Sequence, residues 1–89
     1  MKTVTLALSE MQSVPQLHQY LRRQLELPAY YGGNLDALYD CLTEVCEPVI
    51  LKIPHELAAA PDLGGYGAKL LLVMQEAAAA NPNLQVELI

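Results

Sequence analysis

Residues 48–54 read Pro-Val-Ile-Leu-Lys-Ile-Pro, and this short run decides the fold. It is almost continuously apolar, rich in β-branched side chains and bounded by a proline at each end. A run of this kind is more typical of a strand covered on both faces than of a half-exposed strand. We therefore predict a strand at residues 49–53 that lies in the middle of a sheet.

Two further segments, near the two ends of the chain, supply strands for either side of this middle strand. Residues 2–8 and residues 84–88 each alternate apolar side chains with small or polar ones, which is the period of a strand. The apolar positions are Val4, Leu6, Leu8, Leu84, Val86 and Leu88. The sequence thus predicts three strands separated by two long connections.

The first connection contains two predicted helices. Ser13 is a good N-cap, Pro15 is tolerated in a first turn, and apolar residues then recur at helical spacing until Pro28 ends the helix. Asn34 follows a flexible pair of glycines and is a good N-cap for a second helix. We expect this second helix to run to about residue 45 or 46.

The second connection contains a short helix at about residues 54–60 and a long one at about residues 67–80. The order strand, two helices, strand, two helices, strand requires crossover connections and therefore a parallel sheet. We predict an α/β, two-layer fold with a three-stranded parallel sheet and about four helices packed mainly on one face. A chain of 89 residues leaves room for one modest core, so we expect a single domain over residues 1–89.

The formal net charge of −5 arises entirely in one third of the chain. Between Arg23 and Lys52 there are five carboxylates and no lysine or arginine, whereas the rest of the chain balances five acids against five bases. The five carboxylates are those of Glu26, Asp36, Asp40, Glu44 and Glu47. Such a surface favours a cationic partner, and its sign argues against direct binding of nucleic acid.

The predicted helix after Asn34 has one apolar side and one acidic side. Its apolar side carries Leu35, Leu38, Leu42, Val45 and Cys46, its polar side carries Asp36, Asp40, Thr43 and Glu44, and Tyr39 lies at the border. The helix dipole favours Asp36, but Asp40 lies a turn deeper and repels Asp36, so folding alone gives little reason for Asp40. An ordinary solvated helix face is the default explanation of one acidic residue. The clustering of these residues, with no base nearby in the sequence, favours a binding surface.

Tyr30 and Tyr31 are adjacent in the loop before this helix. One of two adjacent loop tyrosines usually packs into the core, so we expect at least one exposed ring. An exposed tyrosine in an anionic rim is a typical interface anchor, because it is large, rigid and able to form hydrogen bonds.

Several short segments around this loop and helix form a specific motif: Leu17-His18, Leu27-Pro28, Tyr30-Tyr31-Gly32, Asn34-Leu35-Asp36-Ala37-Leu38 and Asp40-Cys41-Leu42-Thr43. In these segments the chain closely resembles the barstar family, the intracellular inhibitors of secreted ribonucleases such as barnase. The likeness is strong over residues 17–51 and continues more weakly over residues 67–76, so it spans most of the chain.

The resemblance implies a barstar-like fold and an inhibitor that binds a small basic extracellular ribonuclease in a one-to-one complex. By matching position, it implies that Asp40 takes the place of the substrate phosphate among arginine, lysine and histidine side chains of the enzyme. The implied flanking contacts are Tyr30, Asn34, Asp36, Tyr39 and Thr43, with Glu76 on the long helix as a second acidic contact. We add Tyr31 and Glu44 to the expected partner-binding residues because they belong to the same loop and acidic face.

Three positions depart from the family pattern. Gly33 replaces an acidic loop residue, and Tyr39 and Val45 stand where the family has tryptophans. These changes keep the central carboxylate but alter its rim, so the partner need not be barnase itself.

Two other functions stay open. Asp36 and Asp40 could act as acid and base or hold Mg²⁺, but no basic residue or phosphate-binding loop lies nearby, and His18 and His55 are far apart in sequence. We therefore predict no enzyme activity, no catalytic or metal-binding residues and no cofactor. The alternative to the inhibitor is a noncatalytic acidic interaction module that binds another basic protein.

The remaining features concern redox state and location. Cys41 and Cys46 are five positions apart and point in different directions on a helix, so we expect both to be reduced and structural. The N-terminal residues are unlike a secretory signal, and no segment approaches the length of a membrane span. We expect a cytoplasmic protein that has no contact with membranes and is monomeric without its partner.

Overall fold

The parallel sheet has its middle strand where the sequence predicts it. The structure, a computed structural model, describes residues 2–89. Strand β2 (Val49–Ile53) lies between β1 (Lys2–Thr5) and β3 (Leu84–Leu88), and both neighbours run parallel to it. Val4 pairs with Leu51, and Leu51 pairs with Val86, so apolar positions of the three strands are aligned across the sheet.

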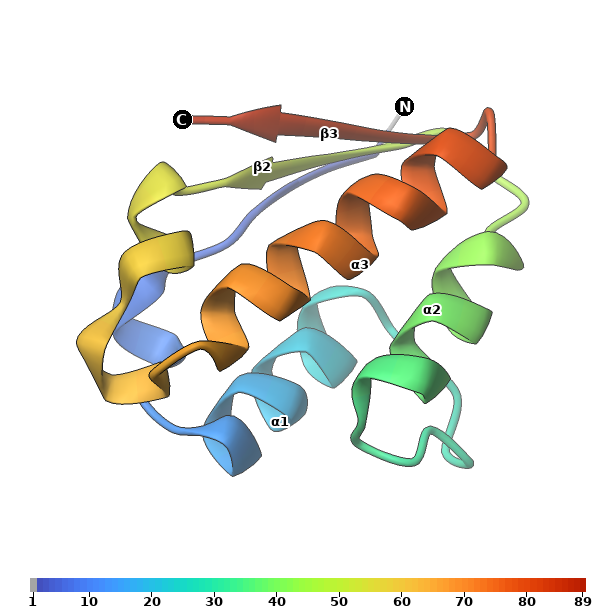
Figure 1. Cartoon of the computed structure of the whole chain (residues 1–89). Helices are drawn as coiled ribbons and strands as arrows, with labels where there is room; N and C mark the ends of the chain where they lie inside the picture. Colours follow the sequence, from blue (N-terminus) through green and yellow to red (C-terminus); the bar gives the residue numbers. More distant parts are fainter. Residues whose placement is uncertain (1) are drawn as a thin grey trace.

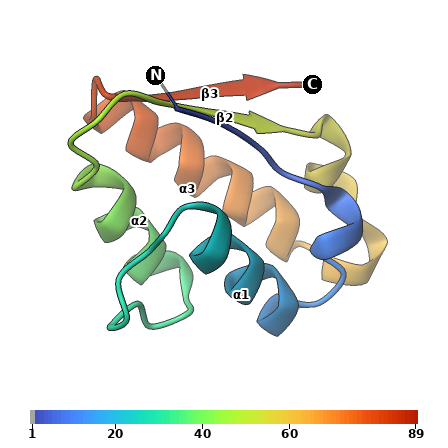
Figure 2. The same ribbon diagram turned by 180° about the vertical axis from the view of Figure 1, so that it is seen from behind.

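Three α-helices pack on one face of this sheet (Figure 1). They are α1 (Val14–Gln24), α2 (Leu35–Thr43) and α3 (Tyr66–Ala80). Seen from behind, the opposite face of the sheet carries no helix (Figure 2). The predicted α/β fold with a three-stranded parallel sheet and helices on one face is therefore confirmed.

The connection after β2 differs from the expected fourth helix. It forms two short 3₁₀ helices, η2 (His55–Ala59) and η3 (Pro61–Leu63). The chain makes one turn, breaks at Pro61 and makes another, because a proline cannot donate the hydrogen bond that a continuous helix needs. The number of α-helices is thus three, close to the expected four.

The first strand is shorter than expected. Pairing ends at Thr5, and Leu8 already belongs to the 3₁₀ helix η1 (Leu8–Glu10). In this register the last residue of β2, Ile53, lies opposite Leu6, whose N–H still donates to the Lys52 carbonyl oxygen at 2.9 Å, so a β1 that continued to Leu8 would have no partner strand beyond Leu6. The alternation of the sequence beyond Thr5 therefore does not continue as a strand.

Helices cover the middle strand on one face only, as predicted for the sheet, although its apolar run is more typical of a strand covered on both faces. Leu51 and Ile53 are buried beneath the helices, whereas Ile50 and Lys52 are half-buried. A middle strand is shielded at both edges by its neighbours, so its outward side chains are partly covered without a second layer. The apolar outward position Ile50 therefore needs no helix above it.

Helix α1 begins as its sequence predicts but ends at Gln24, before the expected stop at Pro28. The Ser13 hydroxyl oxygen accepts a hydrogen bond from the backbone N–H of Gln16 at 3.2 Å, as expected for an N-cap. At the other end the N–H of Leu27 donates to the carbonyl oxygen of Arg22 at 3.0 Å, across Glu26, whose φ is 52°. This is a Schellman closure, and it turns the chain sharply into the loop before α2.

Helix α3 lies close to η2 at its first turn. A Cβ atom at Gly67 would lie 2.1 Å from the carbonyl oxygen of Leu57, so only a glycine allows this approach. Farther along, Leu70, Met74 and Ala77 are fully buried against the rest of the core. In the part of the chain that the structure describes, no helix has both the length and the apolar character to cross a membrane.

Candidate functional site

Helix α2 starts at the residue that the sequence predicts. The Asn34 side-chain oxygen accepts a hydrogen bond from the N–H of Ala37 at 2.8 Å, and Asn34 itself has extended backbone angles. This cap satisfies a backbone donor that has no partner inside the helix. It also fixes the point where the loop ends and the acidic face begins.

The two sides of α2 are separated by burial as expected. Leu38 and Leu42 are buried, whereas Asp36, Asp40 and Glu44 are exposed and Tyr39 and Thr43 are half-buried. Cys41, which the sequence analysis assigned to neither side, lies with the buried residues. The helix presents its carboxylates to solvent because its leucines pack on the core.

The helix ends at Thr43, two or three residues before the expected end. Beyond it, the buried side chain of Asn81 donates hydrogen bonds to the carbonyl oxygens of Leu42 and Val45, both at 3.0 Å. Asn81 therefore satisfies carbonyls that another helical turn would have used. Sequence reasoning treated Asn81 only as the stop of the long helix, so this role in holding α2 was missed.

The carboxylate of Asp40 is free of intramolecular partners. Within residues 2–89 the ion pairs are Lys2 with Glu26 at 3.0 Å and His55 with Glu56 at 3.2 Å, and no hydrogen bond involves the Asp40 carboxylate. The hydroxyl of Thr43 donates to the backbone carbonyl of Asp40 at 2.9 Å, not to its side chain. An exposed and unneutralised anion thus stands on the second turn of a capped helix.

A shallow hollow of about 360 Å³ lies between α2 and α3 and contains this anion. Its lining consists of Leu35, Asp36, Tyr39, Asp40, Val73 and Glu76. Glu76, which only the resemblance had pointed to, therefore shares a concave surface with the two aspartates of α2. Three carboxylates around one hollow, with an apolar floor from Leu35 and Val73, are complementary to a convex cationic partner.

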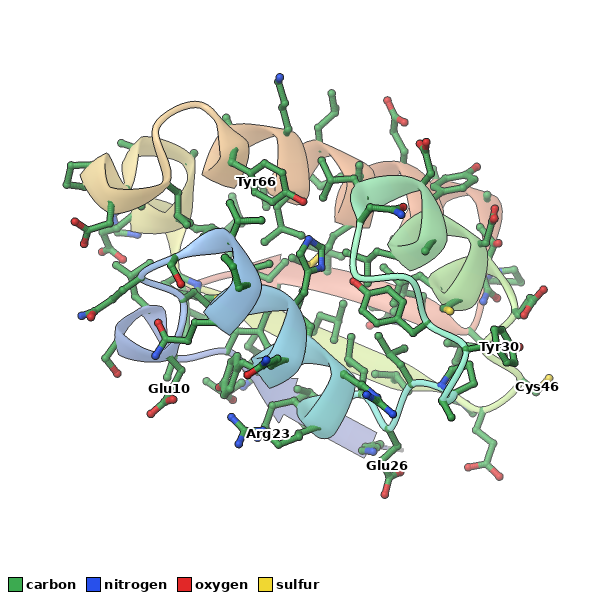
Figure 3. All side chains as sticks on the ribbon, turned by 90° about the horizontal axis from the view of Figure 1, so that it is seen from below. Glu10, Arg23, Glu26, Tyr30, Cys46 and Tyr66 are labelled. Carbon is green, nitrogen blue, oxygen red and sulfur yellow. The ribbon has the colours of Figure 1, made fainter. Side chains whose placement is uncertain are left out.

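The two loop tyrosines differ in exposure, which confirms the expectation of at least one exposed ring. Tyr30 is 77% exposed and lies at the edge of the molecule (Figure 3). Tyr31 is half-buried, and its hydroxyl lies 2.5 Å from Nδ1 of His18. The hydroxyl of Tyr31, a predicted partner-binding residue, is thus engaged by a buried side chain.

The chain resembles known proteins over nearly its whole length. Residues 1–88 match the family described as barstar (barnase inhibitor). The chain belongs to the barstar family. It is also 36% identical, over 78 residues, to a Bacillus subtilis (strain 168) protein named "Putative ribonuclease inhibitor YrdF". The match covers 86% of each chain. Membership places the chain among barnase-inhibitor-like proteins.

The positions that depart from the barstar pattern have structural explanations. Gly33 has φ of 69°, a left-handed conformation that glycine adopts without strain. Tyr39 lines the acidic hollow, so a phenol ring stands there in place of an indole. Val45 lies beyond the C-terminal end of α2, in a different hollow that also includes Leu27, Cys46 and Leu84.

The cysteines of this barstar-family chain differ from each other in burial. Cys41 is buried, and burial, followed by the charges of Glu44 and Asp40, raises the pKa of its thiol, which therefore stays protonated. Cys46 is exposed, and its thiol donates to the carbonyl oxygen of Glu44 at 3.3 Å. Both are free thiols, but Cys46 does not lie on the packed apolar side of the helix that was predicted for it, because the helix ends before it.

Proposed function

We propose that this protein inhibits a small, basic, secreted ribonuclease of the barnase type by occupying its active site in a one-to-one complex. One observation carries the proposal: the exposed carboxylate of Asp40 has no intramolecular partner within residues 2–89 and stands in an acidic hollow. Membership in the barstar family and the printed name of the B. subtilis relative support the same class of partner.

The mechanism follows from what a ribonuclease must bind. Its active site is a preorganised cationic cleft, because the substrate is a chain of phosphodiester anions. The Asp40 carboxylate enters this cleft and accepts charge-assisted hydrogen bonds where a phosphate would accept them. A carboxylate offers no phosphodiester bond to cleave, so occupation alone inhibits the enzyme.

The residues around Asp40 are of two kinds: acidic residues and uncharged contact residues. Asp36 and Glu76 share the hollow with Asp40, and Glu44 lies one turn farther along α2. These charges steer the approach of a basic protein and complement its surface. The remaining contact residues are Tyr30, Tyr31, Asn34, Tyr39 and Thr43.

Each of these contact residues has side-chain atoms that are available to the partner. Tyr30 is the exposed aromatic anchor, and Tyr31 contributes the outer part of its half-buried ring. The oxygen of the Asn34 side chain caps α2, which leaves its NH₂ group to donate to the partner. Tyr39 and Thr43 are half-buried on either side of the exposed carboxylate.

We also propose the oligomeric state and the cellular location in which the protein acts. It works as one domain and as a monomer before it meets the ribonuclease, with no cofactor and no turnover of its own. Its place of action is the cytoplasm of the producing cell, where a ribonuclease that has not been exported would destroy cellular RNA.

A ribonuclease panel tests this function directly. Purified protein is titrated into barnase and into other small secreted ribonucleases, and RNA cleavage is measured at increasing molar ratio. We expect complete loss of activity of at least one enzyme at one equivalent. Binding of basic proteins without loss of any ribonuclease activity would overturn the proposal and support the acidic interaction module instead.

A further inference from the structure

His18 is a buried polar residue that joins three separate parts of the fold. It lies on α1, is only 5% exposed, and has a tyrosine hydroxyl at each ring nitrogen. Nδ1 lies 2.5 Å from the hydroxyl of Tyr31 in the loop before α2, and Nε2 lies 2.5 Å from the hydroxyl of Tyr66 at the start of α3. Figure 3 shows the Tyr66 hydroxyl directed inward from α3.

This arrangement suits a neutral imidazole. A neutral ring has one nitrogen that donates and one that accepts, and a tyrosine hydroxyl can take either role. Within residues 2–89 no buried side-chain nitrogen or oxygen lacks a hydrogen-bond partner. Loss of the imidazole would leave the hydroxyls of Tyr31 and Tyr66 without this partner.

The loop that Tyr31 belongs to is otherwise weakly attached. Its backbone bonds are local: Leu27 N–H donates to Arg22, and Tyr31 N–H donates to Pro28, each at 3.0 Å. Among the described residues, the Tyr31 to His18 contact is the one side-chain hydrogen bond between residues 27–33 and another element. It therefore holds the middle of the loop, next to the exposed ring of Tyr30.

Within residues 2–89, no anion faces His18 from an element packed against it. The loop presents Tyr31, α3 presents Tyr66, and α2 brings Cys41 beside Tyr31, while Arg22 shares a small hollow of about 160 Å³ with His18 on α1. Burial raises the pKa of each of these two tyrosines and of this cysteine, so all three are neutral near neutral pH. Burial lowers the pKa of His18 below its ordinary value of 6.5.

Protonation of His18 would therefore place an uncompensated cation in the interior. His18 lines a small hollow together with Tyr31, Gly32 and Gly33. A charged ring that moved toward water through this hollow would displace the side chain of Tyr31. The loop and its neighbour Tyr30 would then lose their fixed position.

We propose that His18 is a positioning residue for the ribonuclease-binding loop and that it works as a pH-dependent latch. When neutral, it holds Tyr31 inward and thereby presents Tyr30 outward. When protonated, it releases the loop and weakens binding of the ribonuclease. The effect on binding rests on the proposed function, whereas the effect on the loop can be measured in the free protein.

Three variants separate the latch from general effects. His18→Gln keeps one donor and one acceptor but cannot take up a proton. His18→Leu removes both hydrogen bonds. His55→Gln is the matched control, because His55 is the other histidine of the chain and is exposed.

The first measurement is hydrogen exchange of residues 27–33 in the free protein, expressed as protection relative to the intrinsic exchange rate at each pH. For wild type and His55→Gln, we expect protection to fall by at least about fivefold between about pH 7.5 and about pH 5.5. For His18→Gln we expect no such fall, and for His18→Leu low protection at both pH values. Equal pH profiles for wild type and His18→Gln would overturn the latch.

The second measurement uses barnase as the probe and compares dissociation rates at the same two pH values. Other groups on both proteins also titrate, so the contribution of His18 is the difference between wild type and His18→Gln. As the pH falls, we expect the dissociation rate of wild type to rise by a factor at least about three times that of His18→Gln. If barnase binds no variant, the proposed function fails for barnase, and loop exchange alone decides the latch.

Discussion

The side-chain amide of Asn81 donates a hydrogen bond to the carbonyl oxygen of Leu42 at 3.0 Å, although 39 residues separate them. The same amide also donates to Val45 at 3.0 Å, so one buried side chain joins the C-terminal ends of α2 and α3. The acidic hollow lies between the same two helices, toward the N-terminal half of α2.

Replacement of this amide should therefore destabilise the fold. Asn81→Ala removes the closer side-chain donor from the carbonyls of Leu42 and Val45 and the acceptor of the Asn83 N–H. We therefore expect a loss of about 2–4 kcal/mol in the free energy of unfolding, measured by urea denaturation. Asn83→Ala is the control, because Asn83 is half-buried and makes one side-chain bond, at 3.3 Å to Val45. Equal losses in the two variants would contradict the assigned role of Asn81.

A methyl group at the start of α3 should also be costly. At Gly67 it would lie 2.1 Å from the carbonyl oxygen of Leu57, so Gly67→Ala should lower stability by about 1–3 kcal/mol or more. Gly65→Ala is the matched control, because no atom lies within 4 Å of a Cβ there and its φ is −79°. We expect the control to be neutral or slightly stabilising in thermal unfolding. Equal destabilisation of both variants would contradict the packing argument.

The carboxylates of α2 should have different effects on ribonuclease binding. Asp40→Ala should weaken the complex by at least about 2 kcal/mol, roughly thirtyfold in Kd, mainly through faster dissociation. Asp62→Ala is the control, because it removes the same charge from an exposed site on η3. Similar and small effects of both substitutions in a binding assay would argue against active-site occupation by Asp40.

Glu44 should act on association rather than on dissociation. It lies one turn from Asp40 outside the hollow, so Glu44→Ala should slow association by a few-fold at low salt. The difference from wild type should shrink as the salt concentration rises, as stopped-flow measurements at several ionic strengths would reveal. A dissociation rate that changes more than the association rate would place Glu44 in the central contact instead.

The buried imidazole also predicts how stability depends on pH. The pKa of His18 is lowered in the folded protein by burial, so the unfolded chain binds the proton more readily. Stability is therefore complete above the ordinary pKa of 6.5 and falls as the pH drops below it. The urea midpoint of wild type should therefore fall relative to that of His18→Gln as the pH drops through this range. A wild type that gains stability relative to His18→Gln on acidification would refute the sign.

Local signals predicted most of the secondary structure. The caps Ser13 and Asn34 act through bonds to residues three positions away, so their roles could be inferred from neighbouring residues. The end of α2 was predicted too late because Asn81, not a residue of the helix, takes up its last carbonyls. The short helix predicted at residues 54–60 is the 3₁₀ turn η2, and a second 3₁₀ turn, η3, begins at Pro61, where the sequence predicts only a turn.

The candidate site was predicted in part. The acidic face of α2 follows from the spacing of Asp36, Asp40 and Glu44, and the structure leaves these side chains exposed. Glu76 is an ordinary polar position of a long helix in the sequence, and only the packing of α3 beside α2 brings it to the hollow. The inward turn of Tyr31 has no signal of its own, because the adjacent Tyr30 is the same residue type.

The sequence by itself determined the strands, the helix faces and the position of the acidic third of the chain, because period, capping and charge are properties of residues within about four positions of one another. The tertiary structure alone decided that His18 meets Tyr66 across 48 residues, that Asn81 closes α2, and that Gly67 approaches Leu57. These contacts depend on how the helices settle on the parallel sheet, and side-chain shape and hydrogen-bond geometry in the packed core select one arrangement that no local pattern contains.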